Sequence, residues 1–123
     1  MDVLLDEDEQ VIQEAVRHYF EAECDTDRVR RTEDAGEPLD AEMWQQLAEL
    51  GWLGLAYPAM QGGSEAPFTQ LCLLFEEAGR ALAPVPLHPH TVAGLTLADA
   101  VAAGEGGPTA ERLLSEEIGR AHV

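Results

Sequence analysis

The sequence contains few side chains with reactive chemistry, and none of them has a spacing that defines a catalytic centre. His88 and His90 could reach one metal ion from an extended segment, but two ligands without a third nearby make a weak site. Cys72 has no histidine or lysine near it in sequence, which indicates a small core residue and not a nucleophile. Glu76 and Glu77 could form an acid/base pair, but adjacent helical residues face different directions, which favours solvated carboxylates. We therefore predict no catalytic residue and no metal site.

Two other groups could bind a phosphate. Three of the four residues in Arg28–Arg31 are arginines, and pairing with the surrounding carboxylates in solvent is the favoured interpretation. Gly62 and Gly63 do not belong to a G-x-G-x-x-G pattern that follows a strand, so they do not indicate a dinucleotide site. Residue chemistry alone therefore assigns no activity.

The charge of the chain excludes several classes of partner. Twenty-four acidic residues face seven basic ones, all of them arginine, for a formal net charge of −17. Nucleic acids and anionic membranes would repel such a surface, so we predict neither as a partner. Two cysteines are too few for a disulfide framework, no basic apolar signal opens the sequence, and no apolar run approaches the roughly 20 residues of a membrane span. We expect a cytoplasmic protein.

The composition and periodicity predict an all-α fold. The sequence is 46% hydrophobic but only 6% aromatic, which suits close helix packing better than a strand-rich sandwich. From Asp6 to about Glu23 two apolar rows repeat at helical spacing, and Asp6 with Glu9 predicts an N-cap pair. The rows are Val11, Ala15 and Tyr19, and Ile12, Val16 and Phe20. The polar stretch Cys24–Glu37 is predicted to be a loop with one short turn.

The central stretch Met43–Gly63 contains both tryptophans. Asp40 is placed to cap a helix that runs to Leu50, and Gly51 supplies a left-handed residue that stops it as a Schellman motif. Leu53–Tyr57 is apolar but short and is closed by a proline, so it is predicted to be a buried extended connector.

Three more helices complete a predicted bundle of about five. Pro67 begins one helix, whose apolar face is predicted to contain Leu71, Leu74, Phe75, Ala78 and Leu82. The three prolines of Ala83–His90 predict an extended course. Thr91–Ala103 is then an almost wholly apolar helix that needs burial, and Pro108 starts a last one.

The order of these features resembles a known family. W-x-x-L-A-E-L-G-W-L-G-L-A-Y-P, then Gly62-Gly63, then F-E-E-A-G-R-A-L-A-P-V-P, is similar to the N-terminal helical domain of the acyl-CoA dehydrogenase superfamily. The resemblance covers Leu5 to about Leu114, and we assign residues 1–116 to this domain. Each motif alone is weak, and their shared order makes the resemblance specific.

The resemblance implies that the domain comes from an FAD-dependent enzyme with a middle β-domain, a C-terminal helical bundle and sister subunits. In that family a carboxylate removes the α-proton of an acyl-CoA thioester, a hydride passes to the flavin, and an electron-transfer flavoprotein usually takes up the electrons. The absent domains carry most flavin contacts and usually the base. We therefore transfer no catalytic residue, and expect this chain alone to be inactive and not to hold FAD.

The resemblance also implies a wall of the acyl pocket after the Glu-Glu-x-Gly-Arg motif, near Leu87, His90, Thr91 and Leu95. Simple packing of the proline turn onto the bundle is an equal alternative for these residues. Two other functions stay open: a stand-alone helical module that binds a protein through Thr91–Ala103, and the same domain in a flavin oxidase or monooxygenase.

The last seven residues, 117–123, read EIGRAHV. Codons that match a common sequencing-library adapter would encode this run. We therefore expect residues 117–123 to be a non-native tail on a truncated reading frame.

Overall fold

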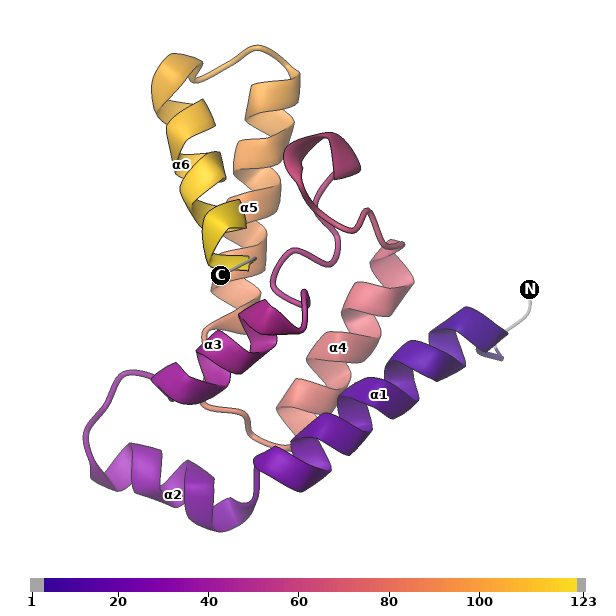
Figure 1. Cartoon of the computed structure of the whole chain (residues 1–123), viewed down its shortest axis with the longest axis vertical. Coiled ribbons are helices and arrows are strands. Elements are labelled where there is room, and N and C mark those ends of the chain that lie inside the picture. Colours follow the sequence, from indigo (N-terminus) through magenta and orange to yellow (C-terminus); the bar gives the residue numbers. More distant parts are fainter. Residues whose placement is uncertain (1–3, 122–123) are drawn as a thin grey trace. The chain divides into compact units, whose positions relative to one another are not determined.

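The computed structural model describes residues 4–121 and is helical throughout, with no strand among these residues (Figure 1). It confirms the all-α class. The elements are α1 (Glu7–Glu23), α2 (Thr26–Asp34), α3 (Ala41–Glu49), the 3₁₀ turn η1 (Ala59–Gln61), α4 (Phe68–Arg80), α5 (Leu87–Ala102) and α6 (Gly107–Ala121). They form two compact units, a first one up to Asp40 plus Pro67–Pro84 and a second one of Ala41–Ala66 plus the chain from Val85 onwards.

In the first unit α1 packs against α4. The carboxylate of Asp6 accepts a hydrogen bond of 2.7 Å from the backbone N–H of Glu9, which confirms the predicted N-cap. Val16 and Phe20 from the second apolar row are buried, while Val11 from the first row is 67% exposed. Only one of the two predicted rows therefore forms the packed face of α1.

The predicted loop at Cys24–Glu37 is wrong, because α2 occupies most of it. The Asp25 side chain accepts from the backbone N–H of Arg28 at 2.8 Å and caps this helix, in which no residue is buried. Arg28 does pair with a carboxylate, as predicted, but not in open solvent. Its Nε lies 2.6 Å from Asp40, and the two side chains are only 15% and 10% exposed.

Helix α4 buries Leu71, Leu74 and Ala78 as predicted, together with Leu73. Two predictions for this segment are wrong. Cys72 is exposed and is not a core residue, since it lies on the outer side of the helix. Leu82 lies beyond the helix end and is 73% exposed, because the chain has already turned away there.

In the second unit the predicted stop of α3 is confirmed. Gly51 has a φ of 79°, and the backbone N–H of Trp52 donates to the carbonyl of Leu47 at 3.1 Å. The N–H of Gly51 also donates to the carbonyl of Ala48, which completes the Schellman pattern. This geometry requires a residue in the left-handed conformation, which glycine adopts without the steric cost that a Cβ would bring.

The connector after α3 is buried as predicted, with Leu53 and Tyr57 at 1% and 0% exposure, but it is not extended. Successive turns form it, since the N–H of Leu55 donates to Trp52 and that of Tyr57 to Gly54. Gly63 then lies so close to Tyr57 that a Cβ there would overlap the Tyr57 carbonyl. The turns satisfy backbone groups that an isolated extended segment would leave unpaired in the interior.

The prediction that Ala83–His90 is wholly extended is also wrong, because α5 begins at Leu87. Pro89 is tolerated there, since the first turn of a helix needs no backbone donor. Helix α5 packs against α6 as a hairpin (Figure 1). No helix in the described part of the chain combines the length and the hydropathy needed to cross a membrane.

A last helix, α6, is present as predicted, but it begins at Gly107, one residue before the predicted start at Pro108, and its backbone continues to Ala121. The side chains of 117–121 and residues 122 and 123 lie outside the described part. The interpretation of 117–123 as a non-native tail stays a prediction.

Candidate functional site

The four residues expected to form a pocket wall all belong to α5 in the second unit. Leu87, His90 and Thr91 are buried, with 4%, 8% and 4% exposure, and Leu95 is partly exposed. The buried stripe continues through Gly94 and Ala98. Helix α5 is therefore buried along one face and not all round, and of the four predicted residues Leu95 has the most open position.

His90 is the polar centre of this stripe. Its Nε2 lies 3.3 Å from the hydroxyl of Tyr57, which also donates to the His90 carbonyl oxygen at 3.3 Å. Both hydrogen bonds can form at the same time when Nε2 is protonated and donates to the Tyr57 hydroxyl oxygen, while the hydroxyl donates to the carbonyl oxygen. The rings of Trp44 and His90 are nearly perpendicular, in a T-shaped contact with a centroid distance of 5.1 Å.

Gly94 brings α5 into close contact with Tyr57. A Cβ at this position would overlap the Tyr57 hydroxyl, and the Tyr57 side chain cannot withdraw because it is fully buried. The hydroxyl of Thr91 donates to the Leu87 carbonyl at 2.8 Å and is used inside the helix. The site is thus a packed, largely apolar stripe in which the side chains of His90 and Thr91 are hydrogen-bonded.

The other sequence candidates do not gather here. His88 is exposed, and no three histidine, cysteine or acidic side chains cluster within the described residues in a way that could hold a metal ion. Tyr57 and Gly94 carried no signal of their own in the sequence. Their roles follow from a contact between segments far apart along the chain.

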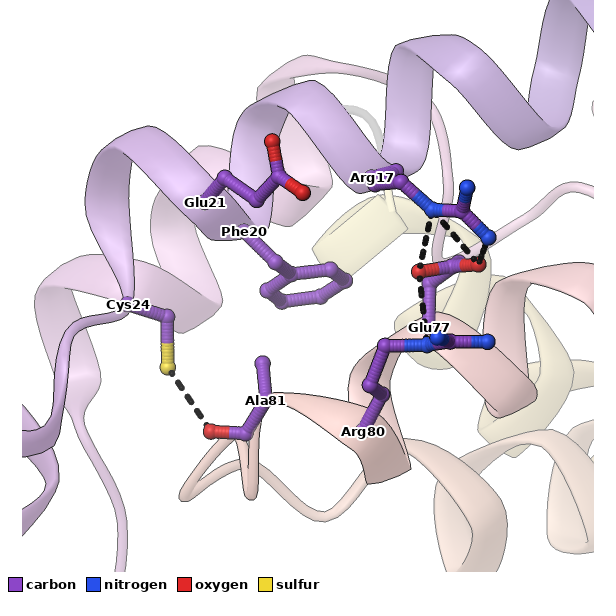
Figure 2. A pocket seen from close by; sticks show the side chains of 7 residues that line it. All are labelled: Arg17, Phe20, Glu21, Cys24, Glu77, Arg80 and Ala81. Atoms are coloured by element: carbon purple, nitrogen blue, oxygen red, sulfur yellow. Dashed lines mark hydrogen bonds and ion pairs between the residues drawn. The ribbon is translucent and has the colours of Figure 1, made fainter.

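A second site, in the first unit, is a pocket of about 170 Å³ between α1 and α4. Figure 2 shows the carboxylate of Glu77 between the guanidinium groups of Arg17 and Arg80. The lining residues are Arg17, Phe20, Glu21, Cys24, Glu77, Arg80 and Ala81. Cys24 donates its thiol to the Ala81 carbonyl at 3.6 Å, and burial raises the pKa of this thiol.

The prediction that Glu76 and Glu77 are both solvated is wrong for Glu77, because its side chain is only 2% exposed. Arg17 donates to it at 2.8 Å from Nη2 and at 3.2 Å from Nε, and Arg80 Nε lies 3.5 Å away. The hydrogen bonds from Arg17 hold the pKa of Glu77 below its usual value, against the effect of burial. Glu76 is 55% exposed, as expected. The pair was missed because Arg17 lies 60 residues away in sequence.

Two pockets in the described residues can be compared in size with the flavin that the family resemblance implies. The pocket beside Glu77 and a second one of about 300 Å³, near Met60 and Leu114, are at or below the smallest size of drug-sized ligand sites, about 300–1,000 Å³. A dinucleotide flavin is larger than such ligands. Neither of these two pockets is therefore large enough for FAD.

Comparison with known proteins gives two relatives. The chain is 37% identical over 89 residues, 65% of its length, to acyl-CoA dehydrogenase FadE34 of Mycobacterium tuberculosis. It is 27% identical over 116 residues, 94% of its length, to acyl-CoA dehydrogenase IpdE2 of Mycolicibacterium smegmatis. These matches span only 12% and 36% of the two relatives. No solved structure matches the chain.

The family profile described as acyl-CoA dehydrogenase, N-terminal domain, matches residues 6–104. This range includes α1 to α5, and with them the buried side chains of Glu77 and His90. The chain therefore belongs to the acyl-CoA dehydrogenase family, as its N-terminal helical domain.

Proposed function

We propose that this domain serves an FAD-dependent, cytoplasmic enzyme that introduces a double bond next to the thioester of an acyl-CoA. The domain contributes one wall of the acyl pocket and packs against the other domains and sister subunits. FAD is held by those other domains, and an electron-transfer flavoprotein is the electron acceptor. On its own this chain is inactive.

The burial pattern of α5 supports the wall. Leu87, His90 and Thr91 are packed inside the second unit, so they shape the wall from behind. Leu95 stands at the edge of the buried stripe with part of its side chain open, which makes it the residue of the four best placed to touch an acyl chain. Gly94 lies so close to Tyr57 that a Cβ would not fit between them, and this contact fixes the position of the helix that carries Leu95.

The wall is tested by Leu95→Trp in a full-length enzyme that contains this domain. The larger side chain should shorten the preferred acyl chain, so that kcat/KM falls more for long than for short acyl-CoA substrates. Thr96→Trp is the matched control, because Thr96 is exposed on the neighbouring position of the same helix. An unchanged chain-length preference in Leu95→Trp argues against the wall.

The inactivity of the isolated chain needs a separate measurement. The purified chain is mixed with FAD, passed through a desalting column and then given acyl-CoA. We expect no flavin absorbance to remain with the protein and no bleaching on addition of substrate. Flavin retained at a one-to-one ratio would contradict this part of the proposal.

A further inference from the structure

The buried stripe of α5 does not by itself determine where the helix lies along its own axis. Two members of the stripe, Gly94 and Ala98, have no side chain or a single methyl group, and most of the stripe is apolar. Apolar contacts have no preferred direction, so a helix with a smooth apolar face can slide at little cost. The axial position of α5 therefore needs a contact that has a direction.

The hydroxyl of Tyr57 makes such a contact. It donates to the backbone carbonyl oxygen of His90 at 3.3 Å, so this bond joins the connector to the main chain of α5. In an α-helix a carbonyl accepts from the N–H four residues on, which for His90 is the N–H of Gly94. Because Gly94 has no Cβ, the hydroxyl can approach the carbonyl beside that helical bond, whereas a Cβ would overlap the hydroxyl.

Tyr57 is itself held in place. Its side chain is fully buried, its backbone N–H donates to the Gly54 carbonyl at 3.2 Å, and its carbonyl accepts from the N–H of Glu65 at 2.9 Å. Glu65 has a φ of 51°, which is unfavourable for a residue with a Cβ. Such strain persists only where the surrounding structure determines the backbone. Tyr57 is therefore a fixed point against which α5 is positioned.

The axial position of α5 matters because Leu95 directly follows Gly94. A helix rises by about 1.5 Å per residue, which is close to the length that one methylene adds to an extended acyl chain. A small slide of α5 therefore moves Leu95 by a comparable length along a bound acyl chain. A pocket distinguishes chains that differ by one methylene by only about 10–200-fold, so such a slide is enough to change the preferred length.

We propose that Tyr57 is a positioning residue for acyl-chain selectivity. Its hydroxyl holds the axial position of α5 through the His90 carbonyl, and this determines where Leu95 meets the acyl chain. The proposal rests on the proposed function of α5 as a wall of the acyl pocket. It adds a residue that is buried inside the second unit and acts on selectivity only through the helix.

Tyr57→Phe in a full-length enzyme that contains this domain tests the proposal, because the ring stays and only the hydroxyl is removed. kcat/KM is measured over a series of straight-chain acyl-CoA substrates. We expect the preference for the best length over its neighbours to fall at least about threefold, or the best length to change, because Leu95 is no longer held at one place. A profile that keeps its shape overturns the proposal, including one that is lowered by the same factor at every length, as a merely structural role would cause.

Tyr19→Phe is the matched control. Tyr19 is the other tyrosine of the chain and lies on α1 in the first unit, so the loss of its hydroxyl should leave the chain-length profile unchanged. An equal change of profile in Tyr19→Phe overturns the proposal.

Methyl NMR of the purified chain distinguishes a failure of this proposal from a failure of the wall. Tyr57→Phe should move the methyl resonances of Leu95, while those of Leu71 in the first unit stay in place. Unmoved Leu95 resonances overturn the positioning role of Tyr57, and the wall still stands if Leu95→Trp changes the chain-length preference. If Leu95→Trp has no effect, the wall fails, and the role of Tyr57 in selectivity fails with it.

Discussion

Helices α4 and α5 each contain one interior glycine and one buried polar side chain that bonds to another part of the chain, but the two helices are held in different ways. In α4 the buried group is the Glu77 carboxylate, neutralised by arginines that reach solvent, and Gly79 faces open space. In α5 the buried group is the His90 imidazole, bonded to a phenol, and Gly94 lies against that same phenol.

The difference shows which physical effect fixes each helix. The contact between α4 and α1 includes a buried charge pair beside its apolar packing, and this pair responds to pH and to the loss of either partner. The position of α5 depends on a contact with Tyr57 that leaves no room for a single carbon atom. Single substitutions can break these two arrangements one at a time.

The largest effect is expected from Gly94→Ala. The added Cβ overlaps the hydroxyl of a fully buried ring, so the helix or the ring must move, at a cost of about 3 kcal/mol in the free energy of unfolding. Urea denaturation measures it. Combining the change with Tyr57→Phe, which removes the overlapping hydroxyl, should recover part of the loss, and a fully stable Gly94→Ala would show that the contact does not exist.

Glu77→Gln comes next. The variant keeps the shape but loses the charge that accepts the hydrogen bonds from Arg17, at a cost of about 2 kcal/mol. Glu76→Gln is the matched control, because Glu76 is adjacent and exposed and should change stability by less than about 0.5 kcal/mol. Equal effects at the two positions would contradict the burial of Glu77.

The contribution of Glu77 should also depend on pH. Its pKa is lowered in the folded chain from the ordinary value of 4.5, so the stabilisation is complete above that value and is lost as the pH falls through the folded pKa. The difference in unfolding free energy between the parent chain and Glu77→Gln should therefore shrink in acid. A difference that stays constant from neutral pH into strong acid would rule out an ionised Glu77.

The smallest effect is expected from Gly79→Ala, which has the opposite sign to Gly94→Ala. Gly79 lies inside α4, and a Cβ there meets no atom within 4 Å. Alanine should therefore stabilise the helix by about 0.5–1 kcal/mol through its higher helix propensity. Thermal unfolding of the two alanine variants side by side measures the contrast, which disappears if both helices tolerate the added carbon equally.

Local signals in the sequence predicted the parts of the fold that depend on neighbouring residues. The Asp6 cap and the Gly51 stop are decided within a few residues of chain, and both are confirmed. Helix α2 was missed because it buries no residue, so no apolar period marks it. Pro89 was read as a helix breaker because its position in the first turn of α5 depends on where that helix begins.

The site depends on contacts that no local pattern contains. The pairing of Arg17 with Glu77 spans 60 residues, and that of Tyr57 with His90 spans 33. A glutamate in an E-E pair and a glycine in an alanine-rich helix have the same sequence signature whether or not a partner covers them. The residues of the proposed wall came instead from family resemblance, and three of the four lie in one buried stripe.

The order of the units along the chain has a consequence for biosynthesis. Each unit consists of two separated segments, so α1 has no packing partner until Pro67–Pro84 has been made, and Ala41–Ala66 waits in the same way for α5. The first unit is completed only after α4 has been made, and the second only after α5 has been made. A nascent chain that stalls before Phe68 would therefore contain only one of the two segments of each unit.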